Sequence, residues 1–297
     1  MTPPLVGKLV IIGVGLIGGS FALALKRGAG VREVVGVGRT RANLETALAS
    51  GIVDRGATLD EAWTSELGDA DLVLVATPVA QIPSLFAAMS GALGSRTVIT
   101  DAGSTKQDVV AAARECLGAA LPRFVPAHPI AGSEESGAAA AFATLYQDRH
   151  VILTPIEATD VAALSKVDGV WKACGARVTM LDPHTHDRIL AAVSHLPHLL
   201  AAAFVAELAV RPDTQQLFDL AGTGFRDFTR IAAAPTEMWR DIALANREAL
   251  QDEIKAFRGA LDVVAAALRS GDGASLEALL RTAHDARRRW AGPDPKP

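Results

Sequence analysis

Residues 9–25 read LVIIGVGLIGGSFALAL, and this stretch decides the fold. Four apolar residues lead into a glycine-rich segment, and an alanine- and leucine-rich segment with helical spacing follows it. This is typical of a strand that turns into a helix, and GxGxxG lies at the junction. Glycines there permit a tight turn and let backbone N–H groups at the helix start approach a pyrophosphate. The stretch predicts a dinucleotide site at Gly13, Gly15, Leu16, Ile17 and Gly18; a purely structural turn is the alternative.

The same apolar run, with Lys8 before it and Lys26 after it, also has the appearance of a signal peptide or membrane anchor. Buried parallel strands read as continuous apolar runs too, and the glycines favour that interpretation. Two cysteines, Cys116 and Cys174, are too few for a disulfide framework. We therefore expect a cytoplasmic protein that does not engage a membrane.

Beyond this stretch, apolar strand-like runs alternate with helical segments as far as Asp182. The expected strands are residues 9–13, 33–38, 72–76, 97–101, 123–127, 150–154 and 177–181, and the expected helices are residues 17–27, 43–50, 82–93 and 106–117. Such alternation predicts an α/β fold with a doubly wound, Rossmann-type parallel sheet. Residues 1–182 are expected to form this dinucleotide-binding domain.

The pattern after Asp182 is helical throughout. Expected helices cover residues 186–210, 214–220, 235–268 and 275–290. We interpret residues 183–291 as an all-α domain for substrate binding and homodimer formation, since long alanine-rich helices usually pack against partners. Residues 292–297 are proline-rich and are expected to form a disordered tail. With 49% apolar residues, a net charge of −4 and no basic block, the chain does not have the composition of a nucleic-acid-binding protein.

The second expected strand ends at Gly38, 20 residues after Gly18, where enzymes that use NAD usually carry an acidic residue. This chain instead reads Gly38-Arg39-Thr40-Arg41. Two guanidinium groups suit a 2′-phosphate, so NADP is favoured weakly over NAD, with a merely solvated loop as the alternative. Thr77 and Pro78 follow another strand, at the sheet edge where the nicotinamide half would lie.

Three further motifs follow in order along the chain. They are DAGSTK at residues 101–106, AHPIAGSE at 127–134, and SHLPH at 194–198 together with GFRDFTRIA at 224–232 and Met238-Trp239. In this order the motifs make the chain resemble the prephenate/arogenate dehydrogenase family from about Lys8 to Phe257. The resemblance implies NAD(P)-dependent oxidative decarboxylation of prephenate or arogenate to 4-hydroxyphenylpyruvate or tyrosine.

The resemblance also implies roles for individual residues. His128 matches the family's general base, a role that suits histidine because its pKa lies near neutrality. Ser104 matches the serine that hydrogen-bonds the reacting hydroxyl, although a serine here could equally cap the helix that begins near Lys106. The expected substrate contacts are His198, Arg230, Ser194 and Glu134. Trp239 is either a core residue or one that reaches a neighbouring subunit.

Other readings remain open at this stage. His184, His186, His195 and His198 lie close together in sequence, but no acid or cysteine pattern completes a zinc site, so no metal is expected. A β-hydroxyacid-type dehydrogenase shares this domain order, but Lys255 lacks the surrounding motif that such an enzyme would carry. A non-catalytic NADP-binding regulator is the third alternative. These residues suit prephenate and arogenate equally, so both remain candidate substrates.

Overall fold

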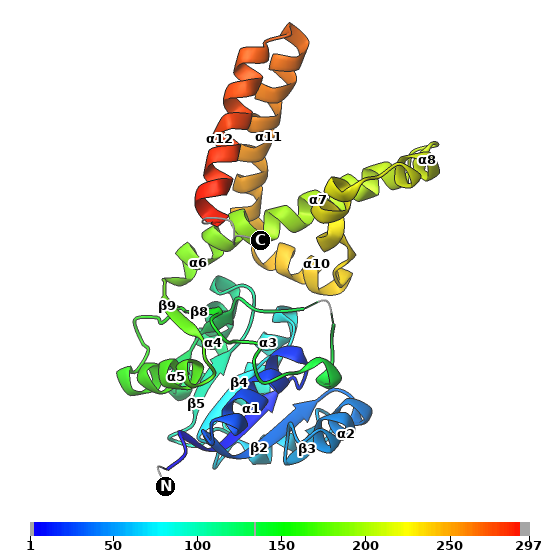
Figure 1. Cartoon of the computed structure of the whole chain (residues 1–297). Helices are drawn as coiled ribbons and strands as arrows, with labels where there is room; N and C mark the ends of the chain where they lie inside the picture. Colours follow the sequence, from blue (N-terminus) through cyan, green and yellow to red (C-terminus); the bar gives the residue numbers. More distant parts are fainter. Residues whose placement is uncertain (1–2, 134, 292–297) are drawn as a thin grey trace. The chain divides into compact units, whose positions relative to one another are not determined.

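The computed structural model describes residues 3–133 and 135–291. The chain divides into two compact units, Met1–Arg247 and Glu248–Pro297. The second unit is a hairpin of α11 (Arg247–Ser270) and α12 (Gly273–Ala291), whose short connection contains Gly271 at a positive φ of 67°. Both sheets belong to the first unit (Figure 1). The expected tail, residues 292–297, lies outside the described residues.

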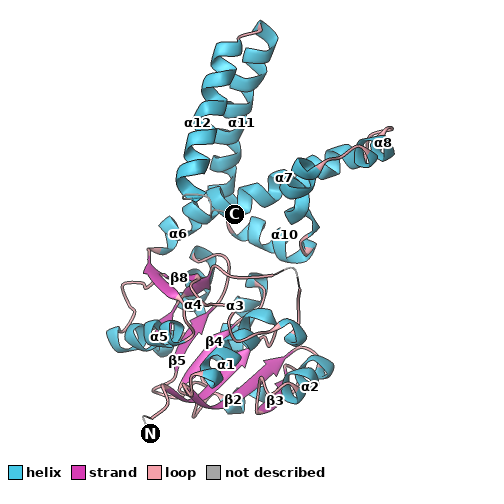
Figure 2. Ribbon diagram, in the orientation of Figure 1, coloured by secondary structure: helices cyan, strands magenta, loops and turns pink. Residues whose placement is uncertain are grey.

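A six-stranded parallel sheet ordered β3-β2-β1-β4-β5-β6 forms the centre of the first unit (Figure 2). Its strands are β1 (Val6–Ile12), β2 (Val31–Gly38), β3 (Arg55–Thr58), β4 (Leu72–Val75), β5 (Val98–Asp101) and β6 (Phe124–Val125). The strand order reverses between β1 and β4, which confirms the doubly wound fold. Ile12 is in register with both Val37 and Val75, so the carboxyl ends of three strands meet at one edge.

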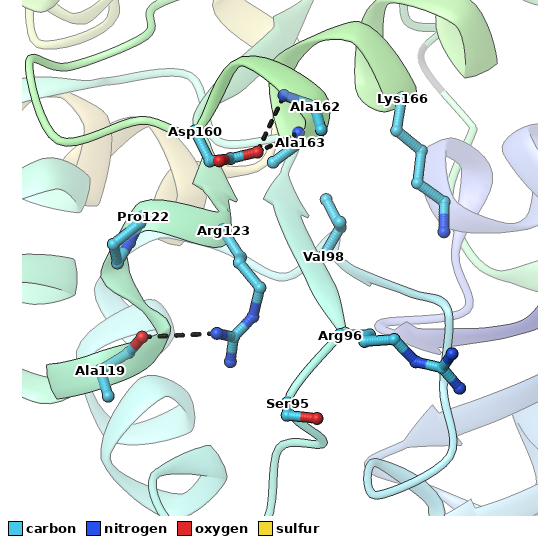
Figure 3. A pocket seen from close by; sticks show the side chains of 10 residues that line it. All are labelled: Ser95, Arg96, Val98, Ala119, Pro122, Arg123, Asp160, Ala162, Ala163 and Lys166. Carbon is cyan, nitrogen blue, oxygen red and sulfur yellow. Dashed lines mark hydrogen bonds between the residues drawn. The ribbon is translucent and has the colours of Figure 1, made fainter.

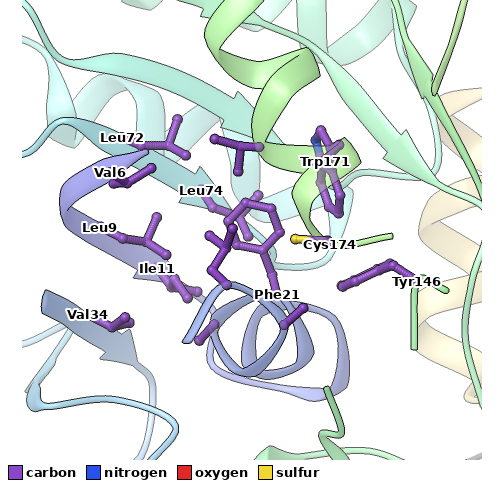
Figure 4. Close-up of a cluster of buried hydrophobic side chains, with 14 of the residues drawn as sticks. Val6, Leu9, Ile11, Phe21, Val34, Leu72, Leu74, Tyr146, Trp171 and Cys174 are labelled. Atoms are coloured by element: carbon purple, nitrogen blue, oxygen red, sulfur yellow. The ribbon is translucent and has the colours of Figure 1, made fainter. Parts of the chain in front are cut away.

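Helices cover both faces of this sheet, and they are α1 (Leu16–Arg27), α2 (Arg41–Ala49), α3 (Ile82–Met89), α4 (Gln107–Cys116) and α5 (Val161–Ala173). Successive residues of β1 enter opposite cores: Leu9 and Ile11 lie in one cluster, Val10 and Ile12 in the other. In the first cluster the ring of Trp171 lies 4.6 Å from that of Phe21, centroid to centroid (Figure 4). Burial on both faces explains the uninterrupted apolar run that could be mistaken for a membrane segment.

The last two expected strands, residues 150–154 and 177–181, do not extend the parallel sheet, and that part of the prediction was wrong; of the expected strand 123–127, only residues 124–125 join the sheet, as β6. β7 (Ala127–Pro129), β8 (His150–Leu153) and β9 (Arg177–Met180) form a separate sheet, in which β7 runs antiparallel to β8. Pro126 has no N–H to donate, and the run expected as one strand is divided there into β6 and β7. β3 was not anticipated, because its sequence RGAT carries no apolar run.

Helices make up the rest of the first unit. They are α6 (Pro183–Leu190), a π-helical turn (Ala191–His195), α7 (Leu196–Ala209), α8 (Thr214–Asp219), α9 (Thr223–Thr229) and α10 (Thr236–Ala245). The helical C-terminal region is therefore confirmed. The helix expected over 235–268 is broken at Asn246, which leaves helical geometry at φ −104° and ψ 31°. Its buried side chain bonds to other parts of the unit instead.

One continuous helix, Pro183–Ala209, is long and apolar enough to cross a membrane by length and composition alone. Only 28% of its most apolar stretch is buried in the structure. The π-helical turn lies in its middle, just before Pro197. Proline lacks the N–H that a regular helical turn needs, and its ring crowds the carbonyl group one turn earlier in the helix. A wider turn relieves this strain.

Candidate active site

The glycine-rich turn has the geometry that a dinucleotide requires. Gly13 adopts a φ of 101°, and a Cβ there would lie 2.5 Å from the carbonyl oxygen of Ala76. A Cβ on Gly18 would lie 2.3 Å from the carbonyl oxygen of Gly13, whereas one on Gly15 would meet nothing within 4 Å. No side chain caps the start of α1. The turn is therefore closed on its inner side and open at the helix N-terminus, where an anionic group binds.

The neighbouring candidates differ in what they can offer. Leu16 is buried and the half-buried Ile17 packs against the core, so only their backbone N–H groups are available to a ligand. Thr77 lies beside Gly13, and its buried hydroxyl has no hydrogen-bond partner among the described residues. A bound ligand would satisfy that hydroxyl. Pro78 is exposed and precedes the short 3-10 helix Val79–Gln81.

Three exposed residues follow the end of β2, as expected. Thr40 occupies the N-cap position of α2, between Arg39 and Arg41. The Arg41 guanidinium forms an ion pair with Glu61. Arg39 does not take part in that ion pair. It is therefore a stronger candidate than Arg41 to bind a phosphate.

A buried ion pair organises the second motif. Lys106 and Asp101 are both fully buried and their charged groups are bonded to each other. Asp101 also accepts hydrogen bonds from the backbone N–H groups of Gly103 (2.7 Å) and Ala127 (3.0 Å), and Lys106 Nζ donates to the Ala127 carbonyl oxygen at 2.8 Å. The pair thus joins the end of β5 to the start of β7 and fixes the backbone next to His128.

His128 lies on β7 with 9% of its surface exposed. Its Nδ1 is 2.8 Å from Nε2 of His186, on α6. Burial lowers the pKa of His128 well below 6.5, and the nearby His186, Lys106 and His195 lower it further. A neutral imidazole whose Nδ1 donates in this contact has its other nitrogen, Nε2, available to accept a proton.

The residue after His186 connects α6 to α4. Asp187 accepts hydrogen bonds from the backbone N–H groups of Lys106 (2.8 Å) and Gln107 (2.9 Å) at the start of α4. It also lies 2.8 Å from Nδ1 of His186. Ser104 is half-buried in the loop between β5 and α4 and does not cap that helix, which removes the structural alternative considered for it.

The SHLPH motif contributes two histidines in different surroundings. His195, in the π-helical turn, is buried, and Asn246 Nδ2 is 3.0 Å from its Nδ1. Burial lowers the pKa of His195 to about 4. His198 donates from Nδ1 to the carbonyl oxygen of Ser194 at 2.9 Å, and its ring stacks on Trp239 at 3.5 Å between centroids. Trp239 is thus adjacent to the expected substrate contacts within one chain.

Arg230 begins the 3-10 helix Arg230–Ala233, which packs against α7. Burial is the larger cause of the lowered pKa of His198, and the positive charge of Arg230 adds to it. A hollow of about 450 Å³ includes Arg226 and Arg230 in its lining. Glu134, the remaining expected substrate contact, lies outside the described residues.

The structure brings part of the predicted site together. His128 and His195 interact through their charges, and His195 and His198 both lie against Trp239. Arg230 is near enough to His198 for its charge to lower the pKa of that histidine. Sequence reasoning missed the positions of His186, Asp187 and Asn246. The adjacent His186 and Asp187 were a usable signal, but only His186 was considered, as one of four histidines in a possible zinc site.

No group of three or more His, Cys, Asp or Glu side chains within 3–133 and 135–291 is placed to hold a metal ion. His186 is instead bonded on both nitrogens, to His128 and Asp187. His195 and His198 also make other contacts, with Asn246 and with the carbonyl oxygen of Ser194.

A second hollow, of about 460 Å³, does not belong to the site (Figure 3). It lies beside Val98, at the amino end of β5, whereas ligands of such sheets bind at the carboxyl ends. Its most central cation, Arg123, donates to the carbonyl oxygens of Gly94, Thr97 and Ala119. Arg123 thus connects its own 3-10 helix, Gly118–Arg123, to the loop that contains Gly94 and Thr97.

Comparison with known proteins identifies the family. The family model for the prephenate dehydrogenase nucleotide-binding domain matches residues 21–180, and that for the prephenate dehydrogenase dimerization domain matches residues 182–282. Prephenate dehydrogenase of Bacillus subtilis is 34% identical over 94% of this chain and 75% of its own length. Cyclohexadienyl dehydrogenase of Zymomonas mobilis is 33% identical over 89% of each chain.

A solved structure is similar throughout. Prephenate dehydrogenase from Aquifex aeolicus, in complex with hydroxyphenyl propionate and NAD+, superposes with a TM-score of 0.87. The two chains are 34% identical, and the match covers 95% of this chain and 97% of the other.

Proposed function

Because this chain belongs to the prephenate dehydrogenase family of oxidoreductases, we propose that it catalyses NADP- or NAD-dependent oxidative decarboxylation of prephenate, arogenate or both. The observation that carries the proposal is a buried, neutral His128 whose Nδ1 is already engaged, next to the edge of the sheet that bears the glycine-rich turn.

In this proposal His128 Nε2 accepts the proton of the substrate's 4-hydroxyl group. The bound nicotinamide supplies the acceptor for the hydride that leaves C4. Cleavage of the bond to the ring carboxylate then releases CO2 and leaves its electron pair in the ring, which becomes aromatic. Ser104 orients the reacting hydroxyl by a hydrogen bond. Since His128 is neutral at pH 7, no proton has to leave it before reaction.

We propose that the substrate's carboxylates are held by His198 and Arg230, with Ser194 and Glu134 as further contacts. An arginine can bind a carboxylate through two parallel hydrogen bonds. The stacking of His198 on Trp239 supports this role, because it holds the imidazole in one orientation.

The direct test is a set of initial rates with prephenate and arogenate, each measured with NAD and with NADP. Reduction of either cofactor with either substrate supports the proposal, and we expect the faster rates with NADP. A folded protein that binds a dinucleotide but reduces it in none of the four combinations would contradict it.

We propose that Gly13, Gly15, Leu16, Ile17 and Gly18 hold the pyrophosphate, Thr77 and Pro78 the nicotinamide half, and Arg39, Thr40 and Arg41 the adenosine ribose. We expect Arg39→Ala to raise KM for NADP about 10- to 100-fold, the cost of one charge-assisted contact, and to leave KM for NAD nearly unchanged. Arg27→Ala, at the opposite end of α1, is the control. Equal effects on the two cofactors would remove Arg39 from phosphate recognition.

Arg230→Ala should raise KM for the substrate about 10- to 100-fold, because hydrogen bonds to charged groups contribute roughly 1.5–3 kcal/mol. Arg230→Lys should recover only part of that loss, since lysine keeps the charge but not the planar fork. Arg240→Ala, in an exposed ion pair with Asp241, is the control and should leave KM unchanged. An unchanged KM in Arg230→Ala would exclude the anchoring role.

We propose that the protein is a cytoplasmic homodimer in which residues 183–291 form the substrate and dimerisation part and residues 1–182 bind the dinucleotide. Its exposed apolar side chains include Val193 (69% exposed) and Phe204 (42%), and large exposed apolar surfaces mark interfaces. Sedimentation equilibrium without detergent should give twice the 30.9 kDa mass of one chain. A monomer that stays soluble only in detergent would favour the membrane reading of Pro183–Ala209 instead.

A further inference from the structure

Three buried side chains from two elements form a continuous line of hydrogen bonds. Asp187 Oδ1 lies 2.8 Å from His186 Nδ1, and His186 Nε2 lies 2.8 Å from His128 Nδ1. His186 has no exposed surface, Asp187 has 1% and His128 has 9%. The line therefore runs from α6 to the proposed base, and its members Asp187 and His186 are shielded from bulk water.

The acceptors along this line determine which ring nitrogen of each histidine carries a proton. Burial raises the pKa of Asp187, but hydrogen bonds from His186 and from two backbone N–H groups outweigh that effect, and the net pKa is lowered. Asp187 is therefore an ionised acceptor, and His186 Nδ1 carries the proton between them. Burial lowers the pKa of His186, so the ring is neutral and its Nε2 has no proton. A hydrogen bond to that nitrogen requires a proton on His128 Nδ1.

The structure assigns a positioning role to His186 and Asp187: they hold His128 as the Nδ1–H tautomer, with the lone pair of Nε2 directed away from them toward the reacting hydroxyl. This inference rests on the proposed function of His128. When Nε2 takes the proton, the substrate O–H bond breaks and a new N–H bond forms. The proton that arrives on Nε2 leaves the hydrogen bond between His128 Nδ1 and His186 Nε2 in place, so the ring keeps its orientation.

Two observations separate this role from simple packing. Asp187 also caps α4 through the backbone N–H groups of Lys106 and Gln107. The hydrogen bonds of the His186 ring, in contrast, go to His128 and Asp187. The charged and titratable groups near His128 are also arranged asymmetrically. They are His186 and Asp187 of α6, Lys106 and Asp101 of the β5–α4 region, and His195 of the π-helical turn. Lys106 is already paired with Asp101, which leaves Asp187 as the anion that is linked to His128 by hydrogen bonds.

The test compares His186→Leu, which removes the acceptor, with His186→Gln, whose side-chain oxygen can accept from His128 Nδ1. We expect His186→Leu to lower kcat about 10- to 100-fold, the range seen when partners that orient functional histidines are removed. KM for the dinucleotide should stay the same, and the acid limb of the pH–rate profile should move, because His186 is one of the groups that lower the pKa of His128. His186→Gln should recover most of kcat. His150→Leu, an exposed histidine on β8, is the control.

Nitrogen-15 NMR of the histidine rings provides a readout that does not depend on turnover. The wild-type spectrum should show His128 protonated on Nδ1 alone, and His186→Leu should show a mixture of tautomers. If His128→Asn abolishes activity while His186→Leu retains the wild-type kcat and pH profile, the positioning role is wrong and the proposed function stands. If the wild-type protein turns over no substrate, the proposed function fails, and the tautomer of His128 still decides whether His186 positions it. A wild-type His128 protonated on Nε2 overturns the inference even if both variants fail to fold.

Discussion

Replacing His128 with asparagine should lower kcat by about 10²–10⁴-fold, the usual contribution of a general base. Asparagine is chosen because its amide nitrogen can take the place of Nδ1 and still donate to His186 Nε2, 2.8 Å away in the native protein. The variant therefore loses Nε2, the atom that accepts the proton, and keeps the hydrogen bond that holds the side chain. The measurement is kcat with the preferred substrate and cofactor, together with titration of the dinucleotide.

Dinucleotide affinity should change little, because His128 lies on β7 and the glycine-rich turn follows β1. His150→Asn, an exposed histidine on the neighbouring strand, should retain wild-type kcat. A His128→Asn enzyme within tenfold of the wild-type rate would show that another group accepts the proton. Loss of activity accompanied by loss of dinucleotide binding would indicate damage to the fold rather than to the chemistry.

The second large effect is expected on stability. Lys106→Met should lower the free energy of unfolding by about 3–5 kcal/mol, because it leaves the carboxylate of Asp101 buried without its cation. Methionine fills a similar length of space but cannot donate to Asp101 or to the carbonyl oxygen of Ala127. Urea unfolding of the purified variant is the measurement.

Arg55→Met is the matched control, since Arg55 pairs with Glu66 while about half of its own side chain is exposed. Such surface pairs contribute about 0–1 kcal/mol, so the control should unfold near the wild-type midpoint. The double change Asp101→Asn with Lys106→Met should recover part of the loss, because no unpaired charge is left buried. Equal midpoints for Lys106→Met and Arg55→Met would mean that the Lys106–Asp101 pair contributes no more than a surface pair.

Much of the fold follows from local patterns. The apolar runs that became β1, β2, β4 and β5 are bounded by glycine or polar residues, and the helices between them have regular apolar spacing. β3 and the second sheet could not be predicted in the same way. Pairing of β8 with β7 and β9 depends on which distant strands meet, and a strand such as RGAT is stabilised by its neighbours rather than by its own residues.

In the candidate site, too, consecutive residues could be predicted and contacts between distant residues could not. The glycine-rich turn could be predicted because its function depends on consecutive residues, and GxGxxG records them in one place. The partner of His128 could not, since His186 is 58 positions away along the chain, on α6. Asn246 illustrates the limit most clearly, because apolar spacing predicted one helix through it. Its side chain instead donates to the carbonyl oxygen of Asp187, and two helices result.

The capping of α4 by Asp187 has a consequence for how this family can be recombined. Asp187 belongs to the segment matched by the dimerization-domain model, yet it completes a helix in the segment matched by the nucleotide-binding model. A hybrid joined at residue 181 would inherit an uncapped α4 unless the donor supplied a carboxylate at the same place. A crossover near residue 247, where the compact units divide, keeps both sides of this contact from one parent. The segment that can be exchanged as a unit between relatives is therefore longer than the nucleotide-binding segment.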